Sequence, residues 1–260
     1  MSSASVTPAV PFTIVVPTAY GQMLVNRHDI NQANALLKTG YAIDHGEIMM
    51  LSQLLGIIGK DHLTVIDVGA NFGTYTLGLA PFVGPNGRVH TFEPQRLIFN
   101  LLVGSVAMNS LTNVYCHNVA LGNTQGKVEI PQFDYNKPMN FGSIEFTPEQ
   151  AEPVSQARLH DPAKAEFVPL TTLDSFEFPQ AHLIKIDAEG MELQIIQGCV
   201  ETIRRCRPVL YVEFLKGDPQ VLGQAITQLG YTLHQMGINF LCIPTELNSK
   251  IQITTKKVGE

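Results

Sequence analysis

The segment Thr64-Val65-Ile66-Asp67-Val68-Gly69-Ala70-Asn71-Phe72-Gly73-Thr74-Tyr75-Thr76 sets the architecture that we expect for this chain. A short β-branched apolar run breaks at an acid and a glycine, and a second apolar run continues to Ala80. This pattern predicts a buried strand, a tight turn and the start of a helix. Glycines let such a turn approach a ligand closely, and the new helix directs backbone N–H groups toward it. The segment therefore predicts a nucleotide-type binding site.

The residues of this turn indicate which ligand it suits. The dinucleotide fingerprint G-x-G-x-x-G has glycine at three positions, and Asn71 and Thr74 occupy the second and third of them here. This disfavours a pyrophosphate and with it an NAD-dependent dehydrogenase. Asp67 at the strand tip would repel phosphate but would suit an ammonium group. S-adenosylmethionine (SAM) carries such a group.

Length and composition describe one globular domain without a nucleic-acid footprint. The 260 residues are 45% hydrophobic and 15% charged, which allows a large core. The net charge is −6 and Lys and Arg form no dense cluster, so we expect no nucleic-acid partner. Residues 1–11 lack a basic and apolar leader, no stretch is long enough to span a bilayer, and the four cysteines form no C-x-x-C pair. These features predict a cytoplasmic protein with reduced core thiols.

Strand and helix patterns alternate along most of the chain. Residues 1–45 are interpreted as an N-terminal tail and accessory segment, with a short strand at 12–16 ended by Pro17, and residues 46–260 as the main domain. Helical spacing is present at 46–58, 95–109, 190–200 and 219–230, and strands are expected at 64–68, 88–92, 113–117, 127–130, 167–173, 183–187, 208–214, 231–234 and 240–243. The alternation predicts an α/β, doubly wound, mostly parallel sheet. Residues 131–166 lack periodicity and are expected to form a mobile lid or substrate insertion.

Parallel sheets of this kind bind ligands outside the carboxyl ends of their strands, so polar residues at strand ends are the informative ones. They are Asp67, Glu93, Asn118, Asp187 and Glu213. Glu93 follows the second strand, where an acid can accept both hydroxyls of a ribose, although it could instead serve the helix that begins after Pro94. Asn118 could pair with an adenine edge or close a turn.

Five stretches resemble the FkbM family of SAM-dependent methyltransferases, in order, over about residues 41–214. They are Val65–Leu77, Phe92-Glu93-Pro94, Asn118-Val119-Ala120-Leu121-Gly122, Thr172-Leu173-Asp174 and Ile184–Leu193, with Ala188 where Val is commoner. The resemblance implies a class I, Rossmann-like methyltransferase sheet of seven strands with an antiparallel last strand. It also implies methyl transfer, usually to oxygen, with residues 46–260 as the methyltransferase domain.

The resemblance assigns cofactor roles position by position. It implies that Asp67 and the Gly69–Gly73 turn lie at the methionine end of SAM, that Glu93 binds the ribose, and that the segment around Asn118 lies beside the adenine. The cofactor-binding positions expected on this basis are Asp67, Gly69, Ala70, Asn71, Gly73, Thr76, Glu93, Pro94, Asn118, Ala120 and Asp187. Residues 1–40 and 131–166 match weakly and are the parts expected to face the acceptor.

Methyl transfer to a hydroxyl needs alignment and removal of one proton, so a base or a metal is required. Asp187, Glu189 and Glu213 are the candidate catalytic residues, because their positions at neighbouring strand ends let three carboxylates converge. They could hold a divalent cation such as Mg²⁺, or one could act as the base with a raised pKa. Glu189 could instead serve a helix N-terminus. Lys185 is expected to neutralise an acid, and His45 and His160 are weaker candidates.

Two other classes of function fit parts of this pattern. A nucleic-acid amino-methyltransferase would need an Asn/Asp-Pro-Pro-aromatic motif where this chain has Asp187-Ala188-Glu189-Gly190. A catalytically silent SAM-binding or scaffold protein would keep the Gly69 turn without needing the acids at the strand ends, and this chain has all of them. We therefore expect a SAM-dependent O-methyltransferase that acts on a small molecule, sugar or glycan, with methylation of nitrogen or a silent scaffold as the alternatives.

Overall fold

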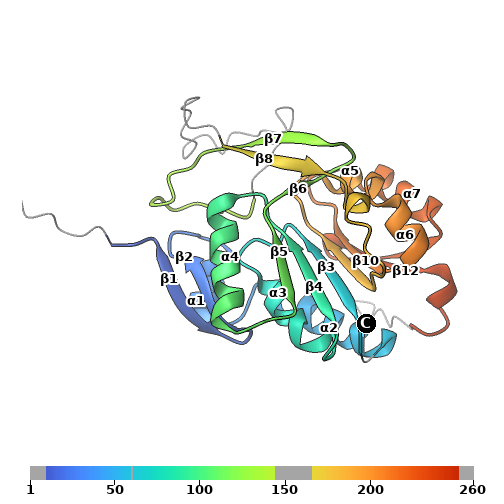
Figure 1. Cartoon of the computed structure of the whole chain (residues 1–260), viewed down its shortest axis with the longest axis horizontal. Coiled ribbons are helices and arrows are strands. Elements are labelled where there is room, and N and C mark those ends of the chain that lie inside the picture. The colour runs from blue at the N-terminus through green and yellow to red at the C-terminus, as the bar shows by residue number, and fades with distance from the viewer. Residues whose placement is uncertain (1–9, 60, 144–165, 252–260) are drawn as a thin grey trace, which may run out of the picture.

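The computed structural model describes residues 10–59, 61–143 and 166–251, and it is built around a seven-stranded sheet (Figure 1). The strand order is β11-β12-β10-β9-β3-β4-β5. All neighbouring pairs from β10 to β5 are parallel, whereas β12 runs antiparallel to both β10 and β11. The strands are β3 (Thr64–Val68), β4 (Arg88–Phe92), β5 (Val114–His117), β9 (Leu183–Ile186), β10 (Val209–Glu213), β11 (Tyr231–Met236) and β12 (Asn239–Pro244). The predicted doubly wound sheet with an antiparallel last strand is confirmed.

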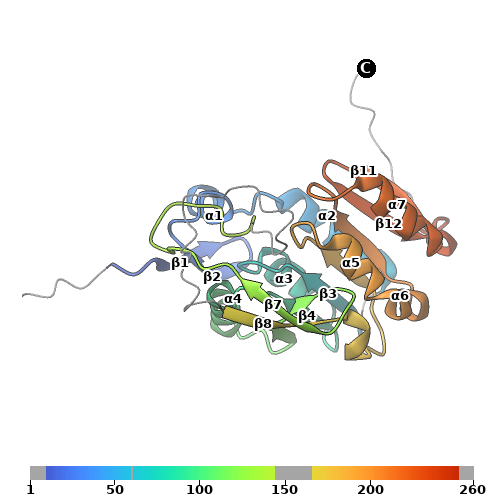
Figure 2. The same cartoon turned by 90° about the horizontal axis from the view of Figure 1, so that it is seen from above.

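Helices cover both faces of this sheet (Figure 2). Successive strand residues alternate between two cores: Val65 and Val89 pack with one set of helices, whereas Ile66 and Ile184 pack with the other. The first set is α1 (Gln32–Thr39), α2 (His45–Ile58), α3 (Thr74–Leu79) and α4 (Arg96–Met108), and the second is α5 (Glu192–Gln197), α6 (Val200–Cys206) and α7 (Pro219–Gln228). Short 3₁₀ helices span Ala80–Phe82, Leu173–Phe176 and Thr245–Leu247. Within the described ranges, no helix is long and apolar enough to cross a membrane.

Two predicted elements differ from the structure. The single helix expected at 190–200 is divided into α5 and α6 at Gly198. A Cβ at this position would come within 1.9 Å of the carbonyl oxygen of Gly122, so the two backbones meet there. The first strand does not end at Pro17, because β1 (Thr13–Thr18) continues through it and pairs with β2 (Gly21–Asn26). Proline is tolerated there because a two-stranded hairpin consists of edge strands.

The N-terminal hairpin shares the core of the main sheet. Met23 and Val25 of β2 and Leu36 of α1 are buried in the same cluster as Ile48. The backbone N–H of Leu24 also donates to the hydroxyl of Ser105 in α4, at 2.8 Å. The accessory segment is therefore packed against the first set of helices, as Figure 1 shows for β2 and α4.

A smaller sheet, β6-β8-β7, follows β5 in the chain and lies at the top of the view in Figure 1. Its strands are β6 (Ala120–Leu121), β7 (Gly126–Ile130) and β8 (Glu166–Thr171). Between β7 and β8, the side chains of Phe133, Met139 and Phe141 are buried in the main core. Residues 131–143 of the expected lid thus have a packing role that their lack of periodicity did not indicate, and residues 144–165 lie outside the described residues.

Asp29 joins the N-terminal segment to this connection. Its carboxylate is buried and accepts backbone N–H groups from Asn31 at 3.1 Å, Ala33 at 2.9 Å and Phe141 at 3.1 Å. A backbone bridge from Asp29 to Met139 runs beside these contacts. One carboxylate therefore both orders the start of α1 and anchors the segment that precedes residue 144.

We expect Asp29→Ala to destabilise the protein by about 2–3 kcal/mol, because three buried N–H groups would lose their acceptor. Asp29→Asn should cost less, since its amide oxygen still serves one side of the junction. Urea denaturation measures both, with Glu129→Ala on the exposed side of β7 as the control, expected within about 0.5 kcal/mol of the parent. An Asp29→Ala variant as stable as Glu129→Ala would contradict this role.

Candidate active site

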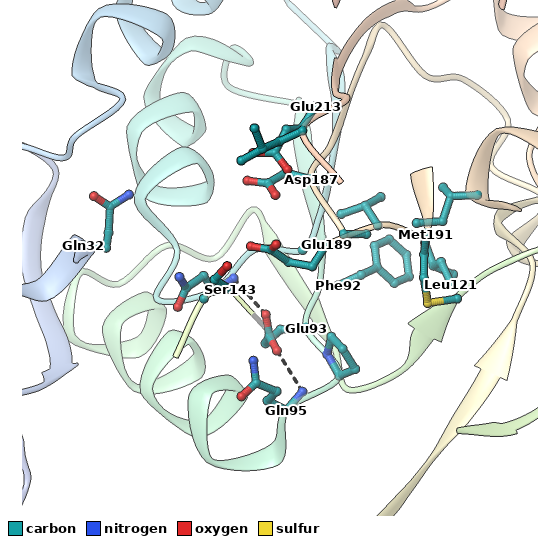
Figure 3. Close-up of a pocket in the computed structure, with 18 of the residues that line it drawn as sticks. Gln32, Phe92, Glu93, Gln95, Leu121, Ser143, Asp187, Glu189, Met191 and Glu213 are labelled. Atoms are coloured by element: carbon teal, nitrogen blue, oxygen red, sulfur yellow. Dashed lines mark hydrogen bonds between the residues drawn. The ribbon is translucent and has the colours of Figure 1, made fainter. Parts of the chain in front are cut away.

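A cavity of about 290 Å³ opens at the carboxyl ends of β3, β4, β9 and β10, where a doubly wound sheet binds its ligands. Val68 and Gly69 line it from β3, Phe92 and Glu93 from β4, and residues 187–189 from the end of β9. Figure 3 shows carboxylates at one end, with Asp187 and Glu213 labelled, and apolar side chains that include Phe92, Leu121 and Met191 at the other.

The expected cofactor-binding positions divide into two groups. Six of them line this cavity: Gly69, Asn71, Glu93, Pro94, Ala120 and Asp187. The other five are absent from its lining: Asp67, Ala70, Gly73, Thr76 and Asn118. The second group lies behind the first, where its members support the turn and the strand ends. A direct contact with a cofactor stays a prediction for all eleven positions.

The turn after β3 is shaped by glycine but keeps its N–H groups inside the protein. Gly69 has φ 73°, and a Cβ there would lie 1.7 Å from the carbonyl oxygen of Asp187, so only glycine lets the two strand ends meet. The N–H groups of Gly69 and Ala70 donate to Phe92 O, and that of Gly73 donates to Ala70 O. Neighbouring backbone thus accepts these three N–H groups of the turn, whereas the expectation that the helix beginning at Thr74 directs its N–H groups toward a ligand stays a prediction.

Asp67 and Lys185 form a buried ion pair beneath the cavity. They face each other across β3 and β9, and Lys185 Nζ lies 3.3 Å from Asp67 Oδ1 and 3.7 Å from Asp187 Oδ2. Burial alone would lower the pKa of Lys185, but the two carboxylates outweigh it and the pKa is raised. The neutralising role expected for Lys185 is confirmed. Asp67 also accepts the hydroxyl of Thr76 at 2.6 Å and so holds α3 to the sheet.

Glu93 lines the cavity and orders the turns on either side of it. Its carboxylate accepts the backbone N–H of Asn71 at 2.9 Å and that of Gln95 at 2.8 Å (dashed lines in Figure 3). Burial raises the pKa of Glu93 to about 7, although these two bonds oppose the shift. Asn118 lies behind Glu93, with its amide donating to the carbonyls of Glu93 and Pro94, while residues 119–121 line the cavity. Of the two roles considered for Asn118, its side chain is observed in the turn-closing one.

The three candidate catalytic carboxylates all line the cavity. Glu213 ends β10 level with Asp187, because their preceding residues Val212 and Ile186 are partners in the parallel ladder. Burial raises the pKa of Glu213 to about 8, and the negative charges of Asp187 and Glu189 add to the shift. Glu213 is thus a group that changes protonation near neutral pH beside an acid on the adjacent strand.

Glu189 has a different partner from the other two. Its carboxylate lies 2.7 Å from Lys216 Nζ, and Lys216 in turn contacts the hydroxyl of Ser143 at 2.9 Å. Burial and then the charge of Asp187 raise the pKa of Glu189 to about 7. The backbone N–H groups of Ala188 and Gly190 donate instead to Glu192. The role considered for Glu189, to serve the N-terminus of a helix, is therefore taken by Glu192, which accepts these N–H groups before α5.

The metal alternative gains no support from this arrangement. Across residues 10–59, 61–143 and 166–251, no group of three or more His, Cys, Asp or Glu side chains is placed to hold a metal ion. The contacts of Glu189 and Asp187 give a physical reason, because an ammonium group lies beside each carboxylate.

Several residues of the cavity were not singled out from the sequence. Asp44 precedes α2, yet its side chain makes no capping hydrogen bond and instead accepts Gln32 Nε2 at 3.2 Å. Asp44, Gln32 and Asn31 line the cavity from the N-terminal segment, and Asn140, Gly142 and Ser143 line it from the connection after β7. The sequence signal that could have identified Asp44 is its position as an acid directly before a helix. His45 does not line the cavity and contacts Tyr20, while His160 lies outside the described residues.

A family model described as the methyltransferase FkbM domain matches residues 67–236, about two thirds of the chain. A comparison with curated proteins finds no match. The matched range includes the Gly69 turn, Glu93 and the three candidate carboxylates, and it leaves out the N-terminal segment that supplies Asp44 and Gln32.

Solved structures with a similar fold share little sequence with this chain. A methyltransferase FkbM from Methylobacillus flagellatus KT is 17% identical, with a TM-score of 0.49 over 72% of this chain and 44% of that one. A precorrin-6y C5,15-methyltransferase from Geobacter metallireducens GS-15 is 13% identical, with a TM-score of 0.42 over 76% and 82% of the two chains. A tRNA (uracil-54, C5)-methyltransferase from Pyrococcus abyssi, in complex with S-adenosyl-L-homocysteine, is 10% identical, with a TM-score of 0.41 over 86% and 40%.

The raised pKa of Glu213 predicts a pH-dependent gain of stability on its neutralisation. The fold disfavours the ionised form, so the cost of ionising Glu213 grows as pH rises from its usual pKa of 4.5 to about 8 and is constant above that. We expect Glu213→Gln to raise the Tm of the ligand-free protein at pH 9 by about 2–4 °C, the effect of about 1 kcal/mol in a chain of this size. The gain should shrink toward pH 5.

Calorimetric scans of Glu213→Gln and of the exposed control Glu129→Gln, each at pH 5 and pH 9, measure this difference. An equal Tm change at both pH values would show that the fold does not disfavour the ionised form of Glu213.

Proposed function

The chain belongs to the FkbM family of SAM-dependent methyltransferases, and on that premise we propose that it transfers a methyl group to a hydroxyl of a small molecule, sugar or glycan. The observation that carries the proposal is the pair of carboxylates, Asp187 and Glu213, at adjacent strand ends of one cavity. Because its pKa is raised to about 8, Glu213 is mostly protonated near neutral pH and can share its proton with the neighbouring carboxylate of Asp187.

The lining of the cavity supports SAM as the cofactor. Phe92, Leu121 and Met191 offer an apolar wall for the adenine, and Glu93 keeps lone pairs free to accept ribose hydroxyls. Toward the other end, the carboxylates of Asp44, Asp67, Asp187 and Glu189 outnumber the ammonium groups of Lys185 and Lys216, and a bound cation would also favour ionisation of Glu213. A cofactor that carries both an ammonium and a sulfonium group complements that excess.

Bound SAM supplies an electrophilic methyl group on a sulfonium. The chain's own task is to align the acceptor hydroxyl with that methyl and to take up its proton as the new C–O bond forms and the C–S bond breaks. We assign the proton acceptor to Asp187, with Glu213 and Glu189 assisting through hydrogen bonds to the acceptor or by sharing the proton. Lys185 holds Asp187 in place from below, Gln32 holds Asp44 at the cavity wall, and Asn140 offers an amide group that can orient a hydroxylated acceptor.

Methyl transfer to nitrogen is the second candidate, because the same carboxylates would attract an amine. Incubation of the protein with SAM labelled with ¹³C in the methyl group and with cell extract separates the two outcomes. A labelled product whose carbon shift is that of a methoxy group supports the proposal, whereas an N-methyl shift would replace it with the nitrogen reaction. The net charge of −6 and the small cavity favour a small-molecule or glycan acceptor over a nucleic acid.

Calorimetry should show that the protein binds SAM and S-adenosylhomocysteine but neither NAD nor ATP, because Asn71 and Thr74 replace the glycines of the pyrophosphate fingerprint. The contact expected between Glu93 and the ribose is best tested by removing a ribose hydroxyl from the ligand. Replacement of Glu93 itself would also leave the backbone N–H groups of Asn71 and Gln95 without their acceptor. We expect 2′-deoxy-S-adenosylhomocysteine to bind more weakly by about 1–3 kcal/mol. Tight binding of NAD without heat from SAM would contradict the proposal.

Asp187→Asn should lower kcat by about 10²–10⁴ while SAM affinity changes by less than about tenfold, since the substitution keeps shape and removes the base. The control is Glu129→Gln, whose exposed carboxylate lies in β7. The measurement is S-adenosylhomocysteine release with the acceptor found in the labelling experiment. Near-normal turnover in Asp187→Asn would refute the assignment and direct attention to Glu213.

A further inference from the structure

Three large aliphatic side chains gather at the mouth of the cavity. Ile43 is 54% exposed, Leu215 is 60% exposed and Ile238 is 45% exposed, and all three line the cavity. We call this set the apolar rim. Single exposed aliphatic residues are ordinary on a protein surface, but three of them around the entrance to a group of carboxylates form a local apolar surface.

The rim is built by segments that are far apart in the sequence. Ile43 directly precedes Asp44 before α2, and its N–H donates to Gln32 Oε1 at 2.9 Å. Leu215 follows the end of β10, two residues after Glu213, and Ile238 lies in the turn between β11 and β12. The N–H of Phe214 donates to the carbonyl of Ile238 at 3.0 Å, which holds these two loops together. Each rim residue is thus fixed beside a side chain of the acidic end.

The rim and the apolar wall of the cavity belong to different ends of the site. The side chains of Phe92, Leu121 and Met191 are buried, and they lie toward Glu93, the residue assigned to the ribose. Ile43, Leu215 and Ile238 lie next to Asp44 and Glu213, where the acceptor must enter to reach the proton acceptor. Because the adenosine part of the cofactor is assigned to the other end of the site, the rim is available to the acceptor.

Resting on the proposed methyl transfer, we propose that the acceptor is amphipathic: its hydroxyl-bearing head enters among the carboxylates, and an apolar body extends outward over Ile43, Leu215 and Ile238. The lining supports both halves. Amide and carboxylate groups of Gln32 and Asp44 meet the head, and aliphatic carbons meet the body. A small, fully polar acceptor would leave the rim exposed to water in the complex and would gain nothing from it.

The test uses the full chain saturated with S-adenosylhomocysteine and a series of n-alkanols from butanol to octanol as probes. Binding is followed by NMR through ¹³C-labelled methyl groups of isoleucine and leucine. A buried methylene contributes about 0.8 kcal/mol, or about fourfold in affinity, so a half-covered chain should gain about twofold per methylene. The signals of Ile43, Leu215 and Ile238 should shift with one common affinity for each alcohol.

Leu215→Ser combined with Ile238→Ser should lower octanol affinity by about five- to tenfold and flatten the dependence on chain length. The matched control is Ile57→Ser, which removes an aliphatic side chain that is 60% exposed on α2 and absent from the cavity lining. It should bind every alcohol as the parent does.

Each outcome bears on one proposal. If S-adenosylhomocysteine binds but alkanol affinity does not rise with chain length, or rises equally in the double variant, the amphipathic acceptor is refuted. It is also refuted if the signals of the three rim residues show no alcohol binding at all. If S-adenosylhomocysteine itself fails to bind, the proposed methyl transfer fails first, and the calorimetry of the cofactor separates that result from the others.

Discussion

A single buried ammonium group, that of Lys185, determines how the reactive end of this fold is assembled. Asp67 on β3 and Asp187 after β9 point to the same side of the sheet, and two carboxylates so placed would repel each other without a cation between them. Lys185 supplies that charge and also donates to the carbonyl oxygen of Gly69, at 2.9 Å. The same group thus joins the central strands, the Gly69 turn and the candidate base. Removal of the ammonium would leave uncompensated buried charge, which is strongly destabilising.

The charge of the cavity follows from what Lys185 leaves unneutralised. It compensates part of the negative charge of the strand ends, Lys216 pairs with Glu189, and Asp44 and Glu213 remain in an environment that raises the pKa of each, first through burial. The excess of carboxylates over ammonium groups at this end disfavours small anions and suits a ligand that brings positive charge, which would also favour ionisation of Asp44 and Glu213. In the proposed function, the carboxylates, the apolar wall and the fixed strand ends recognise the cofactor.

Sequence patterns predicted those parts of the molecule whose causes are local or periodic. The mostly parallel, doubly wound sheet, the strand ends with Asp187 and Glu213, and the pairing of Lys185 follow from alternation along the chain. The number of seven strands and the antiparallel last strand were implied by the family resemblance. Contacts between distant segments were not predictable in this way, because the sequence of neither segment indicates which other segment it contacts. The bond of Lys216 to Glu189, the packing of residues 131–143 and the entry of Asp44 into the cavity are of that kind. Glu192 was missed for a different reason, since its place at the start of α5 looks like ordinary helix sequence.

In the proposed function, the cofactor lies across this cavity with its sulfur facing Asp187 and Glu213. A crystal structure of the protein with S-adenosylhomocysteine tests it most directly. We expect adenine against Phe92, Leu121 and Met191, ribose hydroxyls within hydrogen-bond distance of Glu93, and the sulfur directed toward the two carboxylates. Electron density for the ligand elsewhere, or in this cavity with the sulfur turned away from Asp187 and Glu213, would contradict it.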